Sequence, residues 1–350
     1  MKMSHAPLFY IYAPIYRENA AGIRVLYYLC EELNKRNCDA FIVLSDQGST
    51  HKEQDSEQPV LTITDLESHT QDGRIPIVIY SETIPGNPMN AQRVVRYFLN
   101  FPGALGIGTN KVQANEMKMA YSKNIFKQVS NCDGVLYIPA VKMSELPGPI
   151  NKDPNLNLMY AGKYRAYVGE PGLPAGVQAT EIYRHGSKAQ SHDEVLQLLA
   201  KASRIYLWEN STIGTEAVLL GTVCVFVPNS FLSQIILGEE LGPEGYAENT
   251  TEIEIERAIK TLPLAKAKYE SAMDLSSKQI DDFIEKSQHF FNQQTIKDAP
   301  RIKMPKAGIF LPKYRLAMFL RLISNFGLLR ALKVTYHFGY FSIGKKVKKN

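Results

Sequence analysis

Short apolar runs alternate with longer helical runs along most of this 350-residue chain. Helical spacing is clearest in the run at 22–37, where Val25, Leu29 and Leu33 recur on one face. Strands are expected at 7–14, 39–44, 75–82, 134–139, 156–163, 177–184, 204–208 and 222–228, and helices at 22–37, 90–100, 191–202 and 213–221. Strands that are almost continuously apolar and separated by helices predict parallel sheets covered on both faces.

A turn-rich segment, SELPGPINKDPN at 144–155, interrupts this alternation. Clusters of Pro and Gly favour a domain boundary, and the chain length suits two domains of about 150 residues. After the last strand, long helical stretches run to about residue 293. We therefore expect two tandem Rossmann-like, doubly wound α/β domains at 1–148 and 149–298, followed by a separate segment at 299–350.

The charge is distributed unevenly along the chain. No acid follows Asp298, and residues 299–350 carry 12 of the 40 Lys and Arg, which leaves 28 bases against 35 acids in the body. Only eight uncharged residues separate Arg321 from Arg330, whereas a membrane-spanning helix needs about 20 apolar residues in a row, so the tail is not expected to cross a bilayer. We expect a basic amphipathic tail that lies on an anionic membrane surface. A helix packed on the body, with only residues 345–350 free, is the alternative.

Several other classes of protein are disfavoured. The four cysteines have neither CxxC spacing nor histidine partners, which argues for free, buried thiols in a reducing cytosol and against disulfides or zinc. The Gly-Ile-Gly at 106–108 lacks a completed dinucleotide fingerprint. Residues 8–13 lack the features of a signal peptide, and the acidic body shows no nucleic-acid-binding module. The seven histidines show no pairing that indicates a site.

Two carboxylates flank a polar turn in the second half of the chain. Glu209 follows the expected strand at 204–208, Glu216 lies in the apolar helix after it, and Asn210, Ser211 and Thr212 lie between them. Ligands of parallel sheets bind beyond the carboxyl ends of strands, where helices begin. A capped helix N-terminus there binds anions, and Glu216 could accept both hydroxyls of a ribose. Acids near helix starts are also common simply because they oppose the dipole.

Residues 209–228 resemble the donor-site segment of GT-B glycosyltransferases, in which polar residues, a Glu-Ala pair, a short apolar helix, a Gly and a buried strand follow one another. Residues 19–43 are similar to that family's Gly-bearing loop, first helix and second strand. Residues 158–165 resemble the strand and basic turn that open its second domain. Residues 80–103 are similar to a segment of bacterial surface-polysaccharide glycosyltransferases. The resemblance covers most of residues 8–228.

The resemblance implies roles for particular residues. Glu216 would hold the nucleotide ribose and Glu209 would face the donor sugar. Further donor contacts are implied for Lys163, Arg165, Arg184, Asn210, Ser211 and Thr212. Acceptor contacts are implied for Asn19, Gly22, Asn87 and Arg93. The departing diphosphate would be neutralised by cations and helix N-termini, without a metal or cofactor, since no two Asp are spaced as a DxD motif.

The stereochemical course stays open. Six residues separate Glu209 from Glu216, where retaining members of the family usually have seven. If the reaction inverts configuration, a base must take the acceptor's proton, and Glu18 and Glu82 lie at strand ends suited to this role. Arg96 either contacts the acceptor or occupies an exposed position on the helix expected at 90–100.

The sequence thus predicts a metal-independent glycosyltransferase that moves a sugar from a nucleotide-diphosphate donor to a growing cell-surface glycan. Residues 310–350 would attach the enzyme to the cytoplasmic face of the bacterial inner membrane. Two alternatives remain: a nucleotide-sugar epimerase of the same fold, and a non-catalytic subunit of polysaccharide assembly.

Overall fold

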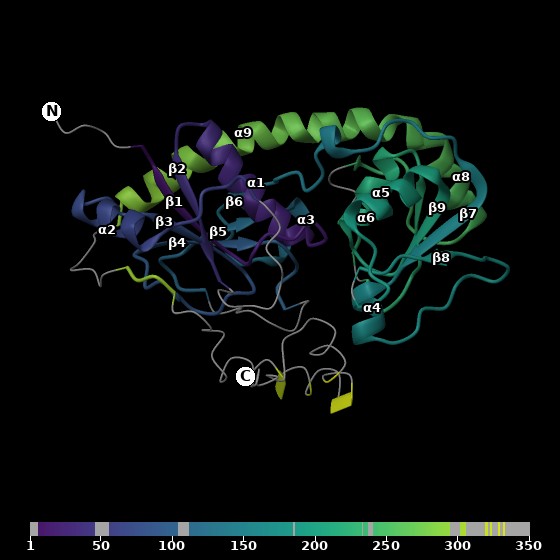
Figure 1. The fold of residues 1–350 in the computed structure, drawn as a ribbon, viewed down its shortest axis with the longest axis horizontal. Helices are drawn as coiled ribbons and strands as arrows, with labels where there is room; N and C mark the ends of the chain where they lie inside the picture. The colour runs from purple at the N-terminus through teal and green to yellow at the C-terminus, as the bar shows by residue number, and fades with distance from the viewer. Residues whose placement is uncertain are drawn as a thin grey trace, which may run out of the picture. The chain divides into compact units, whose positions relative to one another are not determined.

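The computed structural model describes residues 6–45, 56–103, 112–184, 186–232, 234–236, 241–294 and 302–305, with six residues between 319 and 332. Contacts divide the chain into two units, which Figure 1 shows. The first unit contains the chain up to Glu145 and the segment that begins at Leu264. The second contains Leu146–Ile235 and Pro243–Pro263.

The first unit is built on a six-stranded parallel sheet, in the order β2-β1-β3-β4-β5-β6. Its strands are β1 (Leu8–Ala13), β2 (Asp39–Leu44), β3 (Ile77–Ser81), β4 (Arg93–Phe98), β5 (Met117–Ala120) and β6 (Gly134–Val135). Its connecting helices are α1 (Ala21–Lys35), α2 (Ile63–Gln71) and α3 (Lys123–Gln128). All residues of β1 and β3 are buried, as expected for strands covered on both faces.

The second unit repeats this layout with five parallel strands, in the order β11-β10-β9-β7-β8. The strands are β7 (Asp153–Tyr160), β8 (Thr180–Glu181), β9 (Ala202–Leu207), β10 (Val223–Phe226) and β11 (Tyr246–Ala247). The helices are α4 (Gly162–Tyr167), α5 (His192–Lys201), α6 (Thr212–Leu219) and α8 (Glu252–Thr261). In both sheets the first strand lies between the second and the third. The prediction of two doubly wound α/β units is confirmed.

The segment at 90–100 corrects one prediction, because it forms strand β4 and not a helix. Val94 and Val95 are β-branched and Tyr97 and Phe98 are aromatic, which favours a strand. A strand buried on both faces shows no alternation of polar and apolar residues, so its pattern does not separate strand from helix. The sequence also missed the short elements α2, α3 and β5.

Arg96 is fully buried in β4 and not exposed on a helix. Its Nε donates to Glu116 Oε2 at 3.0 Å, and its Nη1 and Nη2 donate to the carbonyls of Ile84 and Gly86 at 2.5 and 2.8 Å. The guanidinium also lies 5.2 Å from the centre of the Tyr80 ring. This network fixes the loop that follows β3 at the carboxyl edge of the first sheet.

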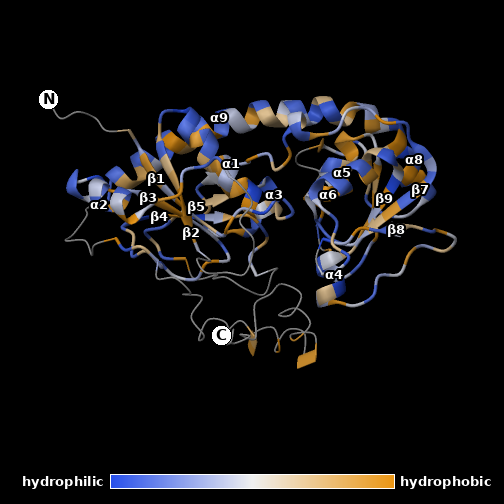
Figure 2. Ribbon diagram, in the orientation of Figure 1, coloured by the Kyte–Doolittle hydropathy of each residue, from blue (hydrophilic) through white to orange (hydrophobic). Residues whose placement is uncertain are grey.

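Helix α9 (Ala265–Asn292) packs on the first unit, whereas the sequence prediction placed it in a domain at 149–298. Ile280, Phe283 and Phe291 are buried in the same apolar cluster as Phe9 of β1. Apolar and polar residues are interspersed along this helix in Figure 2. The buried apolar residues recur along one face of the helix, which predicts that the helix packs against the protein but does not identify the surface against which it packs.

Polar side chains of α9 pair with the backbone beyond the edge strand β6. Ser276 Oγ donates to the Tyr137 carbonyl at 2.6 Å, and the Tyr137 amide donates to Gln279 Oε1 at 2.8 Å. Tyr269 donates from its hydroxyl to the Val141 carbonyl at 2.7 Å. Buried backbone groups need such partners, so these contacts define where α9 docks.

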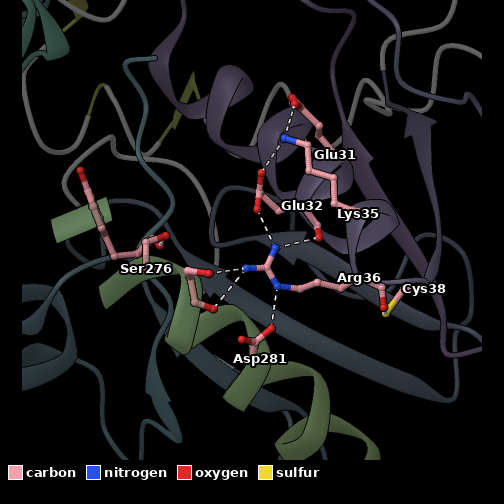
Figure 3. A network of polar contacts seen from close by, with 9 residues as sticks. Glu31, Glu32, Lys35, Arg36, Cys38, Ser276 and Asp281 are labelled. Atoms are coloured by element: carbon pink, nitrogen blue, oxygen red, sulfur yellow. Dashed lines mark hydrogen bonds and ion pairs between the residues drawn. The ribbon is translucent and has the colours of Figure 1, made fainter. Parts of the chain in front are cut away.

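A surface network joins α9 to the end of α1, as Figure 3 shows. Arg36 Nε lies 2.7 Å from Asp281 Oδ1, and its Nη2 donates to Ser277 Oγ at 2.7 Å. On α1 itself, Arg36 Nη1 pairs with Glu32 Oε2 at 2.6 Å. One guanidinium therefore connects two helices that are far apart in the sequence.

The remaining predictions concern the cysteines and the tail. All four cysteines are free thiols, of which Cys30, Cys38 and Cys224 are buried and Cys132 is half-buried. No helix among the described residues is both long and apolar enough to cross a membrane. The predicted basic tail lies almost wholly outside the described residues. Near its start, the Lys303 amide donates to the Met89 carbonyl at 2.9 Å.

Candidate functional site

The candidate site lies at the carboxyl edge of the second sheet, between β7 and β9. Tyr160, the last residue of β7, pairs in register with Leu207, the last residue of β9. The segments 161–163 and 208–211 follow these strands and lead into α4 and α6. Because β7 has the second strand of this sheet on one side and the third on the other, this is the topological switch point, where doubly wound sheets bind ligands.

Glu209 and Lys163 meet at this edge from two different strands. The Glu209 side chain is 1% exposed, and its Oε2 accepts a hydrogen bond from the Tyr164 amide at 2.8 Å. Lys163 Nζ lies 3.8 Å from Glu209 Oε1 and donates to the Asn210 carbonyl at 3.4 Å. Among the described residues, no group donates a hydrogen bond to Oε1. Burial raises the pKa of Glu209 above its ordinary value, while the Lys163 charge opposes this shift.

Glu216 is fully buried in α6 and faces a histidine of the neighbouring helix. His192 Nε2 lies 3.8 Å from Glu216 Oε1, and Nδ1 of the same ring lies 3.4 Å from both terminal nitrogens of Arg184. A guanidinium can only donate, so Nδ1 accepts and the ring proton is on Nε2, facing Glu216. The structure therefore joins the buried side chains of Arg184 and Glu216 through the half-buried ring of His192.

His192 was missed in the sequence, although a local signal marks its position. It is the first residue of α5, directly after Ser191, whose hydroxyl forms a capping box with Glu194. This pattern identifies a helix start. The partner Glu216 lies on another helix, and no local pattern joins the two.

The start of α6 confirms the local prediction. Ser211 is the N-cap residue, and its hydroxyl accepts from the Ile213 amide at 3.3 Å. Thr212 is the first helical residue, and Asn210 Nδ2 donates to the Gln234 carbonyl at 2.6 Å. The amide groups of this helix start therefore lie at the same edge as Glu209 and Lys163, where they favour an anion.

Arg165 is directed elsewhere. Its guanidinium pairs with Glu170 and, at 2.6 Å, with Glu181 Oε1. Since two carboxylates already balance its charge, Arg165 does not join Lys163 and Arg184 around Glu209 and Glu216.

In the first unit, four predicted residues gather at the carboxyl edge of the sheet. Glu82 is buried just beyond β3, and its Oε2 accepts from the Leu99 amide at 3.0 Å. Burial raises the pKa of Glu82 to about 7. Glu18 and Asn19 are exposed in the turn after β1, and Gly22 is exposed in the first turn of α1. A Cβ at Gly22 would lie 3.6 Å from Leu99 Cδ1.

Two other predicted acceptor residues do not join this group. Asn87 holds its own loop, since it accepts from the Tyr80 hydroxyl at 3.0 Å and donates to the Ala91 carbonyl at 2.7 Å. Arg93 is the first residue of β4 and therefore lies at the opposite, amino edge of the sheet. There it donates to Asn292 Oδ1 at 3.5 Å, and burial lowers its pKa.

Comparison with known proteins yields distant structural likenesses. No family model and no curated protein matches this sequence. Among solved structures, a glycosyltransferase from Rickettsia africae is similar with a TM-score of 0.45 at 11% identity, covering 83% of this chain and 100% of its own. An alpha-glucosyltransferase in complex with UDP and a 13-mer DNA has a TM-score of 0.45 at 12% identity, with 82% and 100% covered.

A further similar structure is WaaG, a glycosyltransferase involved in lipopolysaccharide biosynthesis, with a TM-score of 0.41 at 14% identity and coverage of 82% and 100%. Among the residues that the structure describes, no group of three or more His, Cys, Asp or Glu side chains could hold a metal ion.

Proposed function

We propose that this chain is a glycosyltransferase of the GT-B type that transfers a sugar from a nucleotide-diphosphate donor to a glycan acceptor. One observation carries the proposal: Lys163, Glu209, Arg184 and Glu216 all lie near the switch point of the second sheet, beside a capped helix start. This set combines donors for a diphosphate with buried carboxylates for sugar hydroxyls.

Each part of the donor is matched by a different group. The ribose hydroxyls donate to Glu216, whose carboxylate is oriented by His192. Lys163, Arg184 and the amides at the start of α6 stabilise the charge of the departing diphosphate, which is the main electrostatic demand of the reaction. No metal is needed for that step in this proposal. Glu209, buried and partly balanced by Lys163, faces the transferred sugar.

The first unit binds the acceptor in this proposal. Glu18, Asn19 and Gly22 supply exposed contacts next to the buried Glu82. If configuration is inverted, Glu82 is the better base, because a pKa of about 7 matches the working pH of a general base. Asn87 and Arg93 are omitted from this site, since the one holds its own loop and the other lies at the far edge.

A thermal-shift panel of UDP, GDP, dTDP, CDP and CMP tests the proposal. A ligand present at 100 times its dissociation constant stabilises the folded protein by about 2.7 kcal/mol. We expect one nucleoside diphosphate of this panel to raise the melting temperature. If no nucleotide stabilises the protein, the proposal fails and a non-catalytic assembly subunit becomes the better account. Conversion of a nucleotide sugar without any acceptor would identify an epimerase instead.

We further propose that the acceptor is a growing cell-surface glycan and that residues 310–350 hold the enzyme on an anionic membrane. Replacing Lys345 and Lys346 by Gln in the full chain should weaken binding to anionic vesicles by about 2 kcal/mol, or roughly 30-fold, since each base contributes about 1 kcal/mol. Vesicle sedimentation measures this change. Gln at Lys266 and Lys268, two exposed lysines of α9, is the matched control and should leave binding unchanged. Equal losses in both variants would contradict a specific role for the tail.

A further inference from the structure

The side chain of Tyr160 lies against the start of α4, at the edge of the sheet that forms the candidate donor site. Tyr160 is the last residue of β7, and its side chain is buried. A Cβ built on Gly162 would lie 2.6 Å from the Tyr160 hydroxyl oxygen and 2.9 Å from its Cζ. The ring therefore packs directly over the backbone at the start of α4, and only glycine at 162 leaves room for it. This packing holds the hydroxyl next to the segment that carries Lys163.

Charged groups of the site surround this hydroxyl. Burial raises the pKa of Tyr160 far above its ordinary value; the Glu209 and Glu216 charges raise it further, and the Arg184 charge lowers it. The phenol thus stays protonated at neutral pH and remains a hydrogen-bond donor. Three of the ionisable side chains assigned to the donor therefore act on one oxygen atom.

The Tyr160 hydroxyl makes no hydrogen bond with any residue that the structure describes. Buried tyrosine hydroxyls normally have a partner. Partners are present for the hydroxyls of four other buried tyrosines: Tyr10 (His69), Tyr80 (Asn87), Tyr97 (Leu136) and Tyr269 (Val141). The Tyr160 phenol is thus a hydrogen-bond donor that lies beside the charged groups of the site and has no acceptor among the described residues.

We propose that the Tyr160 hydroxyl donates a hydrogen bond to the diphosphate of the bound donor, an inference that rests on the proposed function. The hydrogen-bonding groups of the site favour the diphosphate, and not the sugar, as the partner of this hydroxyl. Sugar and ribose hydroxyls can donate to Glu209 and Glu216, whereas phosphate oxygens only accept and need every donor that the site offers. Tyr160 then joins Lys163 and Arg184 as the third side-chain donor, and it contacts the ligand from strand β7.

Tyr160→Phe tests this role because it removes a single oxygen atom and leaves the ring packed over Gly162. Calorimetric titration of the full chain with UDP, GDP, dTDP and CDP selects the nucleoside diphosphate that binds the wild type. The affinity of Tyr160→Phe for that ligand should fall about tenfold, as for the loss of a hydrogen bond to a charged group. Its affinity for the corresponding nucleoside should not change. Without ligand, its melting temperature should equal or exceed that of the wild type, because no protein contact is lost.

Tyr269→Phe is the matched control, since the hydroxyl of Tyr269 bonds to the Val141 carbonyl in the first unit. This variant should melt earlier and bind the diphosphate normally. Unchanged diphosphate affinity in Tyr160→Phe would overturn the inference while leaving the proposed function intact. An equal loss for nucleoside and diphosphate would also overturn it, because it would indicate a general disturbance of the site. If the wild type binds none of the four diphosphates, the proposed function fails and the inference fails with it.

Discussion

Replacing Glu116 by Leu is expected to destabilise the protein by about 3–5 kcal/mol, because it leaves a buried guanidinium without its carboxylate. Arg96 has no exposed surface, and its side chain is held by Glu116 together with the carbonyls of Ile84 and Gly86. An ion in such a place has no water to replace a lost partner. The effect should appear as a lower midpoint of urea unfolding, followed by circular dichroism.

A double-mutant cycle separates the ion pair from the rest of the network. Arg96→Met removes the charge but also leaves the carbonyls of Ile84 and Gly86 without donors. The double variant should lose less stability than the sum of the two single variants, since it contains no buried unpaired charge. Lys35→Ala breaks only surface ion pairs of α1 and should cost little. Additive losses at 96 and 116 would show that the pair is not coupled.

Replacing Glu216 by Gln is expected to weaken nucleotide binding by about 1–3 kcal/mol, the usual effect of losing a charge-assisted hydrogen bond. Gln has nearly the same size, so the contact with His192 and the packing of α6 should persist. The amide keeps one acceptor oxygen and lacks the charge that strengthens both bonds to the ribose hydroxyls. Titration with the nucleotide that stabilises the wild type measures the loss.

Glu254→Gln provides the control for Glu216→Gln. Glu254 lies on α8 of the same unit, and its carboxylate pairs with Arg257 at 2.8 Å and with no residue of the candidate site that the structure describes. Its replacement should leave nucleotide affinity unchanged. A folded Glu216→Gln variant with wild-type affinity would exclude Glu216 from the donor site, and the ribose would then need another partner.

The sequence predicted those parts of the fold whose signals are local. Helix α1 follows from the recurrence of Val25, Leu29 and Leu33, and strands β1, β2 and β10 follow from continuous apolar runs. The cap at Ser211 is also local, because the residue bonds to an amide two positions away. The positions of Glu209 after a strand and of Glu216 in the helix that follows were predicted in the same way, from neighbouring residues alone.

Strand β4 shows where local signals fail. Arg93 and Arg96 interrupt its apolar run at a spacing that also suits a helix, and burial on both faces removes any alternation. The burial of Arg96 in this strand is matched by the Glu116 carboxylate, which is contributed by a segment 20 residues further on and pairs with its charge. A sequence pattern read one segment at a time cannot include that partner.

By itself, the sequence determined two doubly wound α/β units, the positions of most of their strands along the chain and the place of two acids beside a capped helix, since the signals for these features come from residues that are close in the sequence. Only the tertiary structure decided that α9 packs on the first unit, that Arg184 and His192 align with Glu216, and that Tyr160 ends over Gly162. These features depend on side chains that the chain brings together from distant segments. Burial then changes their chemistry, because it removes the water that would otherwise serve as their partner.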